Sequence, residues 1–423
     1  MKVLMLGWEL PPHISGGLGI ASEGIAEGLT ALGHKVDFLL PKKKKDHTNR
    51  AFKILDASKT KPDLDLWRKK THKVETLRQT EMGLRMIPYL PAEVFEIARE
   101  KQIIVEKLED TAESKLLENV SLTGTYQDSL LNETSKYALL STQIALKNKY
   151  DVVHAHDWVT FKAGRMAAKE AGLPLYVHCH STEYDRNGQY TQSMVIEEER
   201  LGFEAAKKIF CVSQKLKDTI IDKFQVDGEK IVVVPNATKV APGKATNGTN
   251  KKRVLFIGRF THQKSPYSFI DVARDLINRG IDCDFEMIGD GYLRSDLENK
   301  VVQKNLTKEL TFRGFISQSE ALKSLQKADL LIVPSASEPF GLVTLEAVAS
   351  KVPVAAAHGS GIAEFIPSLP QVNLWDHYNF VRLAERLLTE NKFRSDIITK
   401  CFKEANNLSW THSASIIQKN YTS

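Results

Sequence analysis

The sequence predicts an α/β protein built from two doubly wound domains, each with a parallel sheet between helices. Along most of the chain, short apolar runs that end in glycine or polar turns alternate with segments of helical periodicity. A chain of 423 residues is too long for one hydrophobic core, and it suits two domains of roughly 200 residues. Residues 241–253 are rich in Gly, Asn, Thr and Lys and lack periodicity, which is typical of a linker between domains.

The composition is that of an ordinary globular enzyme, with 42% hydrophobic and 26% charged residues. The chain has no apolar run of about 18 residues and no signal peptide, so we expect a cytoplasmic protein. The formal net charge is +6, and its only dense cluster is the lysine run at 42–45. Such a run is usually a solvated loop, but it could also approach an anionic membrane face, so membrane-surface association stays open. We expect no nucleic-acid partner.

Nothing in the residue spacing predicts a metal site. The four cysteines lie at positions 179, 211, 283 and 401 without C-x-x-C spacing, so we expect buried thiols rather than zinc ligands or disulfides. Asp-x-Asp triplets occur at 63–65 and 282–284. The first lies in a charged insertion and the second at a strand start, so neither is placed like a set of metal ligands.

The chain opens with a predicted strand at residues 3–6, followed by a glycine loop at 16–19 (GGLG) and a helix. Prolines at 11–12 block a helix before that loop, and Gly33 is expected to cap the helix at its end. A helix N-terminus at the carboxyl edge of a parallel sheet is a common anion site. The full G-x-G-x-x-G pattern is absent, and no acidic residue follows the strand at 36–40, which argues against a nicotinamide cofactor.

From about residue 42 to 148 a charged, largely helical insertion is expected to interrupt the α/β order, with helices at roughly 92–119 and 132–148. The order resumes at 151–158 (DVVHAHDW), a strand that ends in polar residues, and again at 175–180 (LYVHCH). Two neighbouring strands that both end in histidines at one sheet edge favour a functional role for His180 over a structural one.

The second half repeats the pattern. A strand at 253–258 leads into a turn with Arg259 and Lys264. The planar guanidinium of Arg259 can donate two parallel hydrogen bonds and the ammonium of Lys264 supplies a compact positive charge, so the two side chains can bind one pyrophosphate. Solvated surface charges are the alternative. Further strands are predicted at 285–288 and 353–357, and a terminal helix carries Trp410 and Tyr421.

The most informative stretch is 335–350 (SASEPFGLVTLEAVAS), which follows an apolar strand at 330–334. Pro339 biases the residue before it toward extended backbone, so Glu338 is predicted in a loop and Glu346 on the helix that follows. A strand, a glycine-containing loop and a helix N-terminus together favour a bound anion such as phosphate. An ordinary crossover with two solvated glutamates is the alternative.

Taken in order, these motifs resemble the family 4 retaining glycosyltransferases (glycosyl transferases group 1), nearest the glycogen synthase-like branch. The family resemblance is carried by E-x7-E at 338–346, G-G-L at 16–18, H-A-H-D-W at 154–158, G-R-x4-K at 258–264 and the G-x-G-I-x-E turn at 359–364. It implies the GT-B fold, in which two Rossmann-like domains face each other across a cleft. The implied boundaries are an acceptor-side domain at 1–240, a linker at 241–253, a nucleotide-sugar domain at 254–395 and a helix at 396–423 that crosses back.

The resemblance also implies roles for individual residues. Glu338 and His180 would be catalytic, and Glu346 would bind the ribose. The expected donor-phosphate residues are Arg259, Lys264, Gly17, Val343 and Thr344. The expected donor-sugar residues are Phe340, Gly341 and Leu342. The substrate would be a UDP-, ADP- or GDP-linked sugar, with no metal or other cofactor, and the acceptor a carbohydrate or a small molecule.

Three departures from the family pattern are visible: Ile14 replaces a lysine that glycogen synthases keep, Ala237 replaces a usual glycine, and Ser360 replaces another. ADP-glucose-dependent glycogen synthesis is therefore not implied. A GT-B phosphorylase, a sugar-nucleotide epimerase, a nicotinamide oxidoreductase and a non-catalytic sugar-binding module remain alternatives. The 42–148 insertion either encodes acceptor identity or is a structural elaboration.

Overall fold

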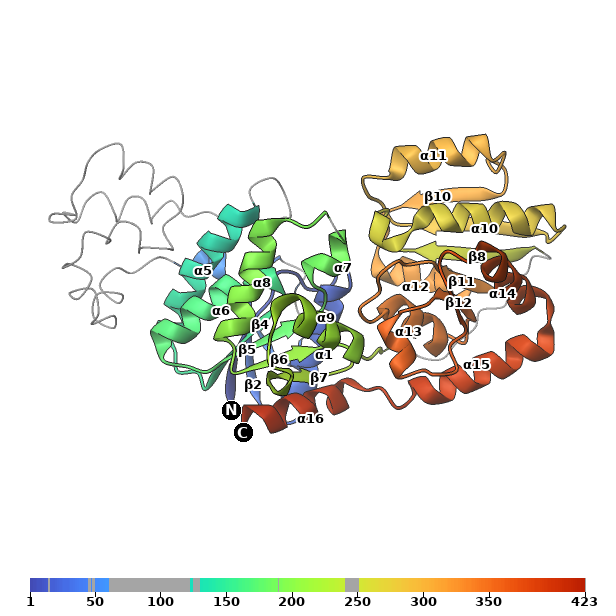
Figure 1. The fold of residues 1–423 in the computed structure, drawn as a ribbon. Coiled ribbons are helices and arrows are strands. Elements are labelled where there is room, and N and C mark those ends of the chain that lie inside the picture. Colours follow the sequence, from blue (N-terminus) through green and yellow to red (C-terminus); the bar gives the residue numbers. More distant parts are fainter. Residues whose placement is uncertain are drawn as a thin grey trace, which may run out of the picture.

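The computed structural model describes residues 1–13, 16–44, 47, 50–60, 122–124, 130–188, 190–239 and 251–422. In these ranges the chain forms two parallel sheets, one of seven strands and one of six, with helices on both faces of each. The two sheets lie in separate halves of the molecule (Figure 1). This is the GT-B arrangement that the sequence predicts.

The first sheet has the order β3-β2-β1-β4-β5-β6-β7, with all neighbours parallel. Central strand β4 is buried along its whole length, as expected for a parallel strand covered on both faces. The strands span Lys2–Leu6 (β1), Lys35–Leu40 (β2), Lys53–Asp56 (β3), Val152–His156 (β4), Leu175–Cys179 (β5), Lys208–Cys211 (β6) and Ile231–Val233 (β7).

Helices α5 and α6 pack together on one face of this sheet, and α1 packs with the terminal helix α16 on the other. The α-helices of this half span Gly17–Ala31 (α1), Leu130–Lys147 (α5), Trp158–Ala171 (α6), Glu183–Asn187 (α7), Ser193–Ala205 (α8) and Gln214–Phe224 (α9). Short 3₁₀ turns lie at Ala57–Lys59 (η1) and Gly228–Lys230 (η4).

The second sheet has the order β10-β9-β8-β11-β12-β13, again with all neighbours parallel. Its strands span Lys252–Ile257 (β8), Cys283–Ile288 (β9), Leu310–Gly314 (β10), Leu330–Val333 (β11), Val354–Ala357 (β12) and Gln371–Val372 (β13). Its α-helices span Pro266–Asn278 (α10), Arg294–Gln303 (α11), Gln318–Gln326 (α12), Leu342–Ala349 (α13), His377–Thr389 (α14) and Asn391–Ala405 (α15). The 3₁₀ turns of this half are His262–Lys264 (η5) and Gly361–Glu364 (η6).

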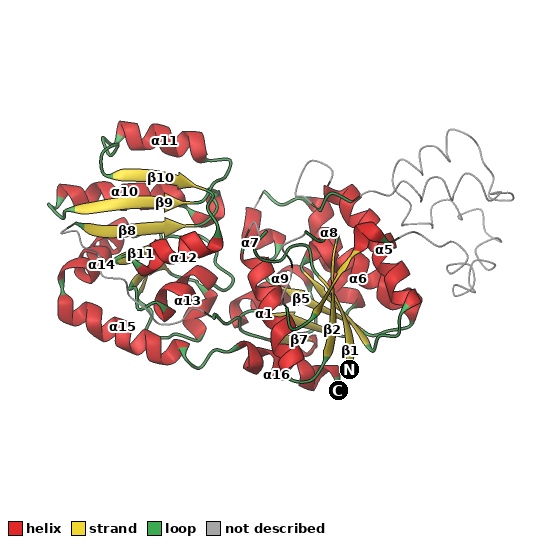
Figure 2. Cartoon of the chain, turned by 180° about the vertical axis from the view of Figure 1, so that it is seen from behind, coloured by secondary structure: helices red, strands yellow, loops and turns green. Residues whose placement is uncertain are grey.

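After α15 the chain crosses from the second half back to the first, where it forms helix α16 (Trp410–Tyr421). Figure 2 shows this crossing from behind. A Cβ atom at Gly28 of α1 would lie 2.4 Å from the carbonyl oxygen of Trp410, so this glycine lets the two helices approach closely. At its other end, the Tyr421 hydroxyl lies 2.5 Å from His154 Nδ1 in the first sheet. The crossing helix is therefore packed into the first half at both ends.

The structure differs from the sequence-based expectation in several places. The helix predicted at 132–148 is present as α5, but it packs on α6 as part of the helical layer and does not belong to an insertion. The segment 42–148 also contributes strand β3 to the edge of the sheet. A two-residue strand, β13, follows the strand predicted at 353–357 and was not itself predicted. The boundary expected at 395/396 falls inside α15, and α16 alone makes the crossing. The helix predicted at 92–119 lies outside the described residues, as does Ile14.

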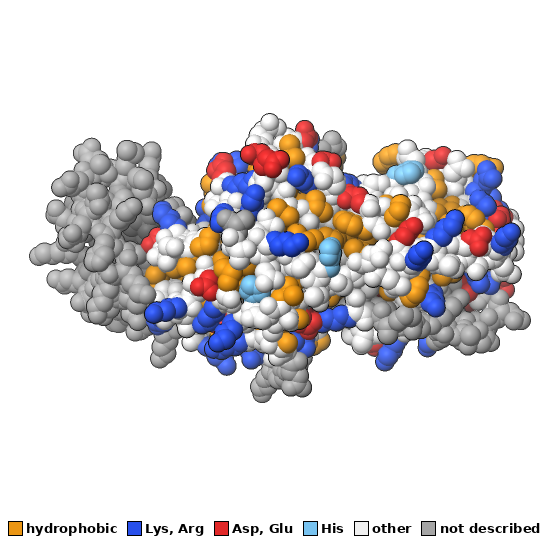
Figure 3. Space-filling model, turned by 90° about the horizontal axis from the view of Figure 1, so that it is seen from below, with side chains coloured by type: hydrophobic (Ala, Val, Ile, Leu, Met, Phe, Trp, Pro, Cys, Tyr) orange, Lys and Arg blue, Asp and Glu red, His pale blue; other side chains and the backbone are white. Residues whose placement is uncertain are grey.

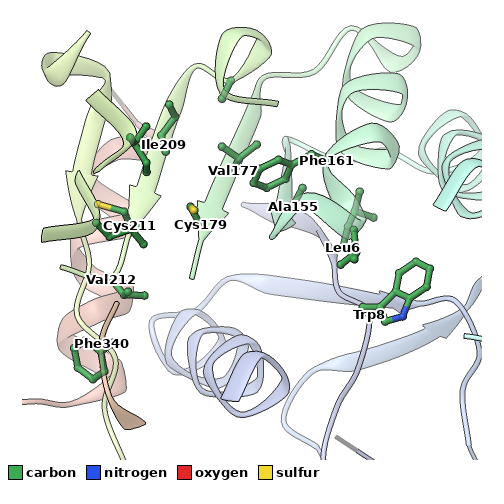
Figure 4. Packing of buried hydrophobic residues seen from close by; sticks show 14 of the residues in the cluster. Leu6, Trp8, Ala155, Phe161, Val177, Cys179, Ile209, Cys211, Val212 and Phe340 are labelled. Carbon is green, nitrogen blue, oxygen red and sulfur yellow. The ribbon is translucent and has the colours of Figure 1, made fainter. Parts of the chain in front are cut away.

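The hydrophobic core continues from one half of the molecule into the other. A single cluster contains Val212 at the end of β6 and also Phe340 and Leu345 around the start of α13. Figure 4 shows Phe340, which comes from the second half, beside Val212. The loop before α13 is therefore packed against the first half of the molecule.

The charge distribution on the surface and the state of the cysteines agree with what the sequence predicts. On the face shown in Figure 3, basic and acidic side chains are interspersed rather than separated into fields of one sign. All four cysteines are free and buried, as predicted. Among the described helices, none combines the length and the apolar character that crossing a membrane requires.

Candidate active site

The predicted site residues gather around the loop that joins β11 to α13. Glu338 lies in this loop and is only 8% exposed. Its Oε2 atom lies 2.5 Å from Lys264 Nζ and accepts a hydrogen bond of 3.1 Å from Ser335 Oγ. A carboxylate this buried needs such partners, because burying an unpaired charge is costly. The structure thus brings Glu338 and Lys264 together, although 74 residues separate them.

Arg259 and Lys264 both follow β8 but differ in their surroundings. Lys264 ends the η5 turn and is paired with Glu338. Arg259 is exposed and forms no ion pair in the part of the chain that the structure describes. A guanidinium without an internal partner remains available to an anionic ligand.

The N-terminus of α13 offers backbone donors to the same region. Gly341, which precedes it, has φ +112°, a conformation that suits glycine, and no side chain caps the helix there. The N–H groups of Leu342, Val343 and Thr344 are therefore open to an anion, which the helix dipole favours. The Thr344 hydroxyl is also buried without a partner among the described residues.

Gly17, the first residue of α1, lies against this helix start from the other half of the molecule. A Cβ atom at Gly17 would come within 2.9 Å of Leu342 Cδ1. Phe340 turns its side chain into the core between the two halves and is 3% exposed. A sugar could therefore meet the backbone of Phe340 but not its ring.

Glu346 lies on α13, about one turn beyond Leu342, and keeps part of its surface exposed. Burial raises the pKa of its carboxyl to about 7, and a hydrogen bond with the Gln318 side chain opposes that rise. The carboxyl is therefore close to half ionised at neutral pH. Ionisation would make it the stronger acceptor for hydroxyl groups.

His180 follows β5 and is held at its backbone and at its ring. Its backbone N–H donates to Asp157 Oδ1 at 2.7 Å, and its Nε2 lies 3.0 Å from His156 Nδ1. Burial lowers the pKa of His180 to about 3, so the ring is neutral at physiological pH. Its Nδ1 atom is buried and has no partner within the described ranges, although the residue as a whole is half-buried.

Behind His180 lies a stack of further histidines that sequence reasoning did not recognise. Nitrogens of His154, His156 and His178 lie within 4.8 Å of one another, a spacing that raises the question of a metal ion. The three rings, however, stack with interplanar angles of 6–13°. Metals bind imidazole in the plane of the ring, and stacked parallel planes do not converge on one point. The stack is better described as a neutral polar core, because burial lowers the pKa of all three rings.

Contacts from the first half of the molecule to the Glu338 loop were also not predicted. Asp185 of α7 is buried, and its Oδ1 accepts a hydrogen bond of 2.8 Å from Ser337 Oγ. Ser213, before α9, donates to the carbonyl oxygen of Pro339 at 2.6 Å. No sequence motif signals these contacts, because both pairs are more than 120 residues apart in the chain.

A hollow of about 550 Å³ lies elsewhere, between Arg165, Lys169 and Lys207. Its lining includes Leu175 and Lys207, at the beginning of β5 and just before β6. Ligands of open α/β sheets bind at the carboxyl ends of the strands. We therefore place the candidate active site at the Glu338 loop and not in this hollow.

Comparison with known proteins agrees with this fold and site. A family model described as "Glycosyltransferase Family 4" matches residues 117–241, and one described as "Glycosyl transferases group 1" matches residues 239–403. Two parallel-sheet domains with these matches define a glycosyltransferase of the GT-B type. The chain belongs to family 4 of these enzymes.

Relatives span nearly the whole chain at low identity. An uncharacterised glycosyltransferase of Methanocaldococcus jannaschii is 24% identical, over 96% of this chain and 93% of the relative. A glycogen synthase of Mycobacterium tuberculosis is 25% identical, over 86% of this chain and 80% of the relative.

Solved structures share the fold. Sucrose-phosphate synthase from Thermosynechococcus elongatus superposes with a TM-score of 0.72 at 16% identity, covering 100% of this chain and 98% of that one. Anabaena HepE in complex with UDP and glucose gives a TM-score of 0.68 at 15% identity, covering 100% and 99%.

Proposed function

We propose that this glycosyltransferase moves a sugar from a nucleoside diphosphate to an acceptor hydroxyl, with retention at the anomeric carbon and without a divalent metal. The observation that carries the proposal is the convergence of Lys264, Glu338 and the uncapped start of α13 at one sheet edge. A cation and open N–H groups suit a leaving diphosphate, and a carboxylate beside them suits a sugar that becomes positively charged.

The leaving diphosphate is the group that gains negative charge as the sugar departs. Arg259, Lys264 and the N–H groups at 342–344 would stabilise it, which is the role that Mg²⁺ plays in other transferases. The acidic triplet at 282–284 lies at the amino end of β9, where Asp282 and Asp284 pair with Lys251. That position is on the edge of the sheet away from the Glu338 loop, so the triplet does not supply metal ligands to this site.

Glu338 and His180 would act on the sugar. The carboxylate of Glu338 stabilises positive charge near the anomeric carbon, while a neutral His180 hydrogen-bonds a sugar hydroxyl without adding repulsive charge. In a retaining transfer, the bond from the anomeric carbon to the phosphate oxygen breaks and a bond to the acceptor oxygen forms on the same face. The acceptor proton then passes to the departing phosphate oxygen.

The nucleotide is proposed to be UDP, ADP or GDP, and Glu346 is proposed to bind its ribose. HepE was solved with UDP and glucose, and a starch synthase IV domain from Arabidopsis thaliana with ADP and acarbose. The latter has a TM-score of 0.67 at 13% identity. These neighbours support a nucleotide-sugar donor and a carbohydrate acceptor as the substrates to test first.

The test begins with a thermal-shift screen of UDP, ADP and GDP. A ligand at about 100 times its dissociation constant adds roughly 2.7 kcal/mol of stability. The matching sugar nucleotides are then incubated with candidate acceptors, and the anomeric configuration of the product is read by NMR, with and without EDTA. We expect a retained configuration and full turnover in EDTA. Inversion, or activity lost in EDTA and restored by Mg²⁺ or Mn²⁺, contradicts the proposal.

A further inference from the structure

Three consecutive carbonyl oxygens of the Glu338 loop are held by hydrogen bonds. Gly361 N donates to the carbonyl of Glu338 at 2.9 Å, and Ile362 N donates to that of Phe340 at 2.7 Å. Both donors belong to the η6 turn of the same half of the molecule. The middle carbonyl, of Pro339, accepts from Ser213 Oγ of the other half at 2.6 Å. The backbone geometry of this loop is therefore fixed from both halves.

The helix that follows Ser213 is capped by a carboxylate from the second half. Glu364 accepts hydrogen bonds from the backbone N–H of Gln214 at 2.6 Å and of Lys215 at 2.8 Å. Ser213 Oγ accepts the next N–H, of Leu216, at 3.1 Å. Carboxylates are favoured at helix N-termini, where these donors would otherwise lack partners. Glu364 thus attaches the second half to the start of α9.

The Lys215 side chain adds a contact from the first half to the second. Its Nζ donates to the carbonyl oxygen of Gly359, in the turn just before η6. Burial lowers the pKa of Lys215, while the carboxylates of Asp185, Glu338 and Glu364 oppose that effect. Lys215 therefore lies within electrostatic reach of Glu338.

The backbone of Gly361 is tightly packed against the Glu338 loop and Ser213. A Cβ atom at Gly361 would lie 1.9 Å from the Pro339 carbonyl oxygen and 2.8 Å from Ser213 Cβ. Phe340 and Val212 complete the contact within one buried apolar cluster (Figure 4). A displacement of α9 would consequently be transmitted to the loop, because well-packed contacts move together.

We propose that Ser213, Lys215 and Glu364 form an interdomain clamp that sets the Glu338 loop in its reactive geometry when the two halves meet. The three are positioning residues, since they act through the loop and not on the substrate. The inference rests on the proposed function and adds a regulatory step to it. Nucleotide binding rests mainly on Arg259, Lys264 and the start of α13 in the second half, whereas sugar transfer also needs the clamp.

The test compares Glu364→Gln with the matched control Glu404→Gln. Glu404 also accepts a backbone N–H and a hydroxyl hydrogen bond, both from Ser368, but entirely within the second half. Steady-state kinetics, calorimetric binding of the nucleoside diphosphate found in the screen, and small-angle scattering are measured on each variant. For Glu364→Gln we expect kcat to fall about tenfold, nucleotide Kd to stay within twofold, and the scattering profile to become more extended. For Glu404→Gln we expect no change in any of the three.

A second variant, Lys215→Met, guards against a folding failure of Glu364→Gln, because it removes no partner of a helix N–H group. It should show the same fall in kcat with unchanged nucleotide binding. The clamp is refuted if both variants keep kcat within twofold of the control. The clamp is also refuted if nucleotide affinity and kcat fall by similar factors, since the second half itself would then be damaged.

An activity-independent measurement separates the clamp from the proposed function. Amide hydrogen exchange at Gln214 and Lys215 should be slow in the unaltered protein and faster in Glu364→Gln. An unaltered protein that turns over no sugar nucleotide would overturn the proposed function, while the exchange rates would still decide whether the clamp forms. Equal exchange in both proteins would overturn the clamp.

Discussion

Lys264 Nζ lies 2.5 Å from Glu338 Oε2, so the cation predicted to bind the donor phosphate is already bonded to the carboxylate predicted to act on the donor sugar. The pair joins η5 to the loop before α13. A bound diphosphate must therefore share Lys264 with Glu338 or draw it away. Either way, donor binding and the charge state around Glu338 are coupled.

Removing Lys264 should destabilise the fold as well as weaken donor binding. In Lys264→Met the buried Glu338 carboxylate loses its counter-ion, which should cost about 2–3 kcal/mol of unfolding free energy in urea titrations. The double variant Lys264→Met/Glu338→Gln should regain most of that loss, because no charge is then left unpaired. The more exposed pair Lys300–Asp271, at 2.6 Å, supplies the control. Lys300→Met should cost about 0–1 kcal/mol. Equal losses in the two single variants would contradict the argument.

The raised pKa of Glu346, about 7, predicts a pH-dependent penalty on stability. Between the ordinary carboxyl value and pH 7 the unfolded chain is ionised while the folded protein keeps the proton. Stability contributed by this group is therefore full below about pH 4.5 and is lost as the pH rises to 7. Glu346→Gln, which cannot ionise, should match the unaltered protein at pH 4 and exceed it at pH 8 by about 1–3 kcal/mol. Urea unfolding of both proteins at pH 4 and pH 8 checks this prediction. The prediction is wrong if the difference in unfolding free energy between the two proteins is the same at both pH values.

The sequence predicted the strands and loops of the sites well because their signals are local. Apolar runs, glycines and Pro339 determine where β11 ends and α13 begins, and both appear where expected. Strand β3 was missed because its four residues, KILD, carry two charges and lie at the sheet edge, where burial does not impose an apolar pattern. Strand β13 was missed because its two residues are too few to show an apolar run or an alternation.

The contacts that hold the candidate site together could not be predicted in the same way. The bond from Ser213 to Pro339 joins residues 126 apart, and its acceptor is a backbone carbonyl that any residue could supply. The contact between His156 and His180 had a partial signal, because alternate histidines occur in two neighbouring strands. Only the strand order shows that these histidines share one face.

His156 is predicted to orient the ring of His180. In His156→Phe the ring of His180 loses its Nε2 partner at 3.0 Å, so kcat should fall about tenfold while nucleoside diphosphate Kd stays unchanged. His178→Phe is the control, because it adds the same volume beside His180, with ring centroids 4.5 Å apart, and breaks no hydrogen bond among the described residues. Steady-state kinetics should show the loss in the first variant only. Similar losses in both would point to overpacking of the core instead.

The two glutamates of the α13 region provide the sharpest separation of binding from catalysis. Glu346 is proposed to accept hydrogen bonds from the ribose in both the ground and the transition state. Glu346→Gln should therefore raise the donor KM and the Kd of the free nucleoside diphosphate together, with a smaller effect on kcat. Both effects should shrink below pH 7, where the carboxyl is largely protonated.

Glu338 is proposed to act only as positive charge grows on the sugar, so Glu338→Gln should lower kcat while the bare nucleotide binds almost as before. Some gain in nucleotide affinity is even expected, because Lys264 loses its carboxylate partner and becomes fully available to the diphosphate. Calorimetry with the nucleoside diphosphate beside steady-state kinetics on both variants makes the comparison. If Glu338→Gln weakens nucleotide binding as much as Glu346→Gln does, or if both variants keep full activity, the proposed roles are wrong and the Glu338 loop serves only to connect β11 to α13.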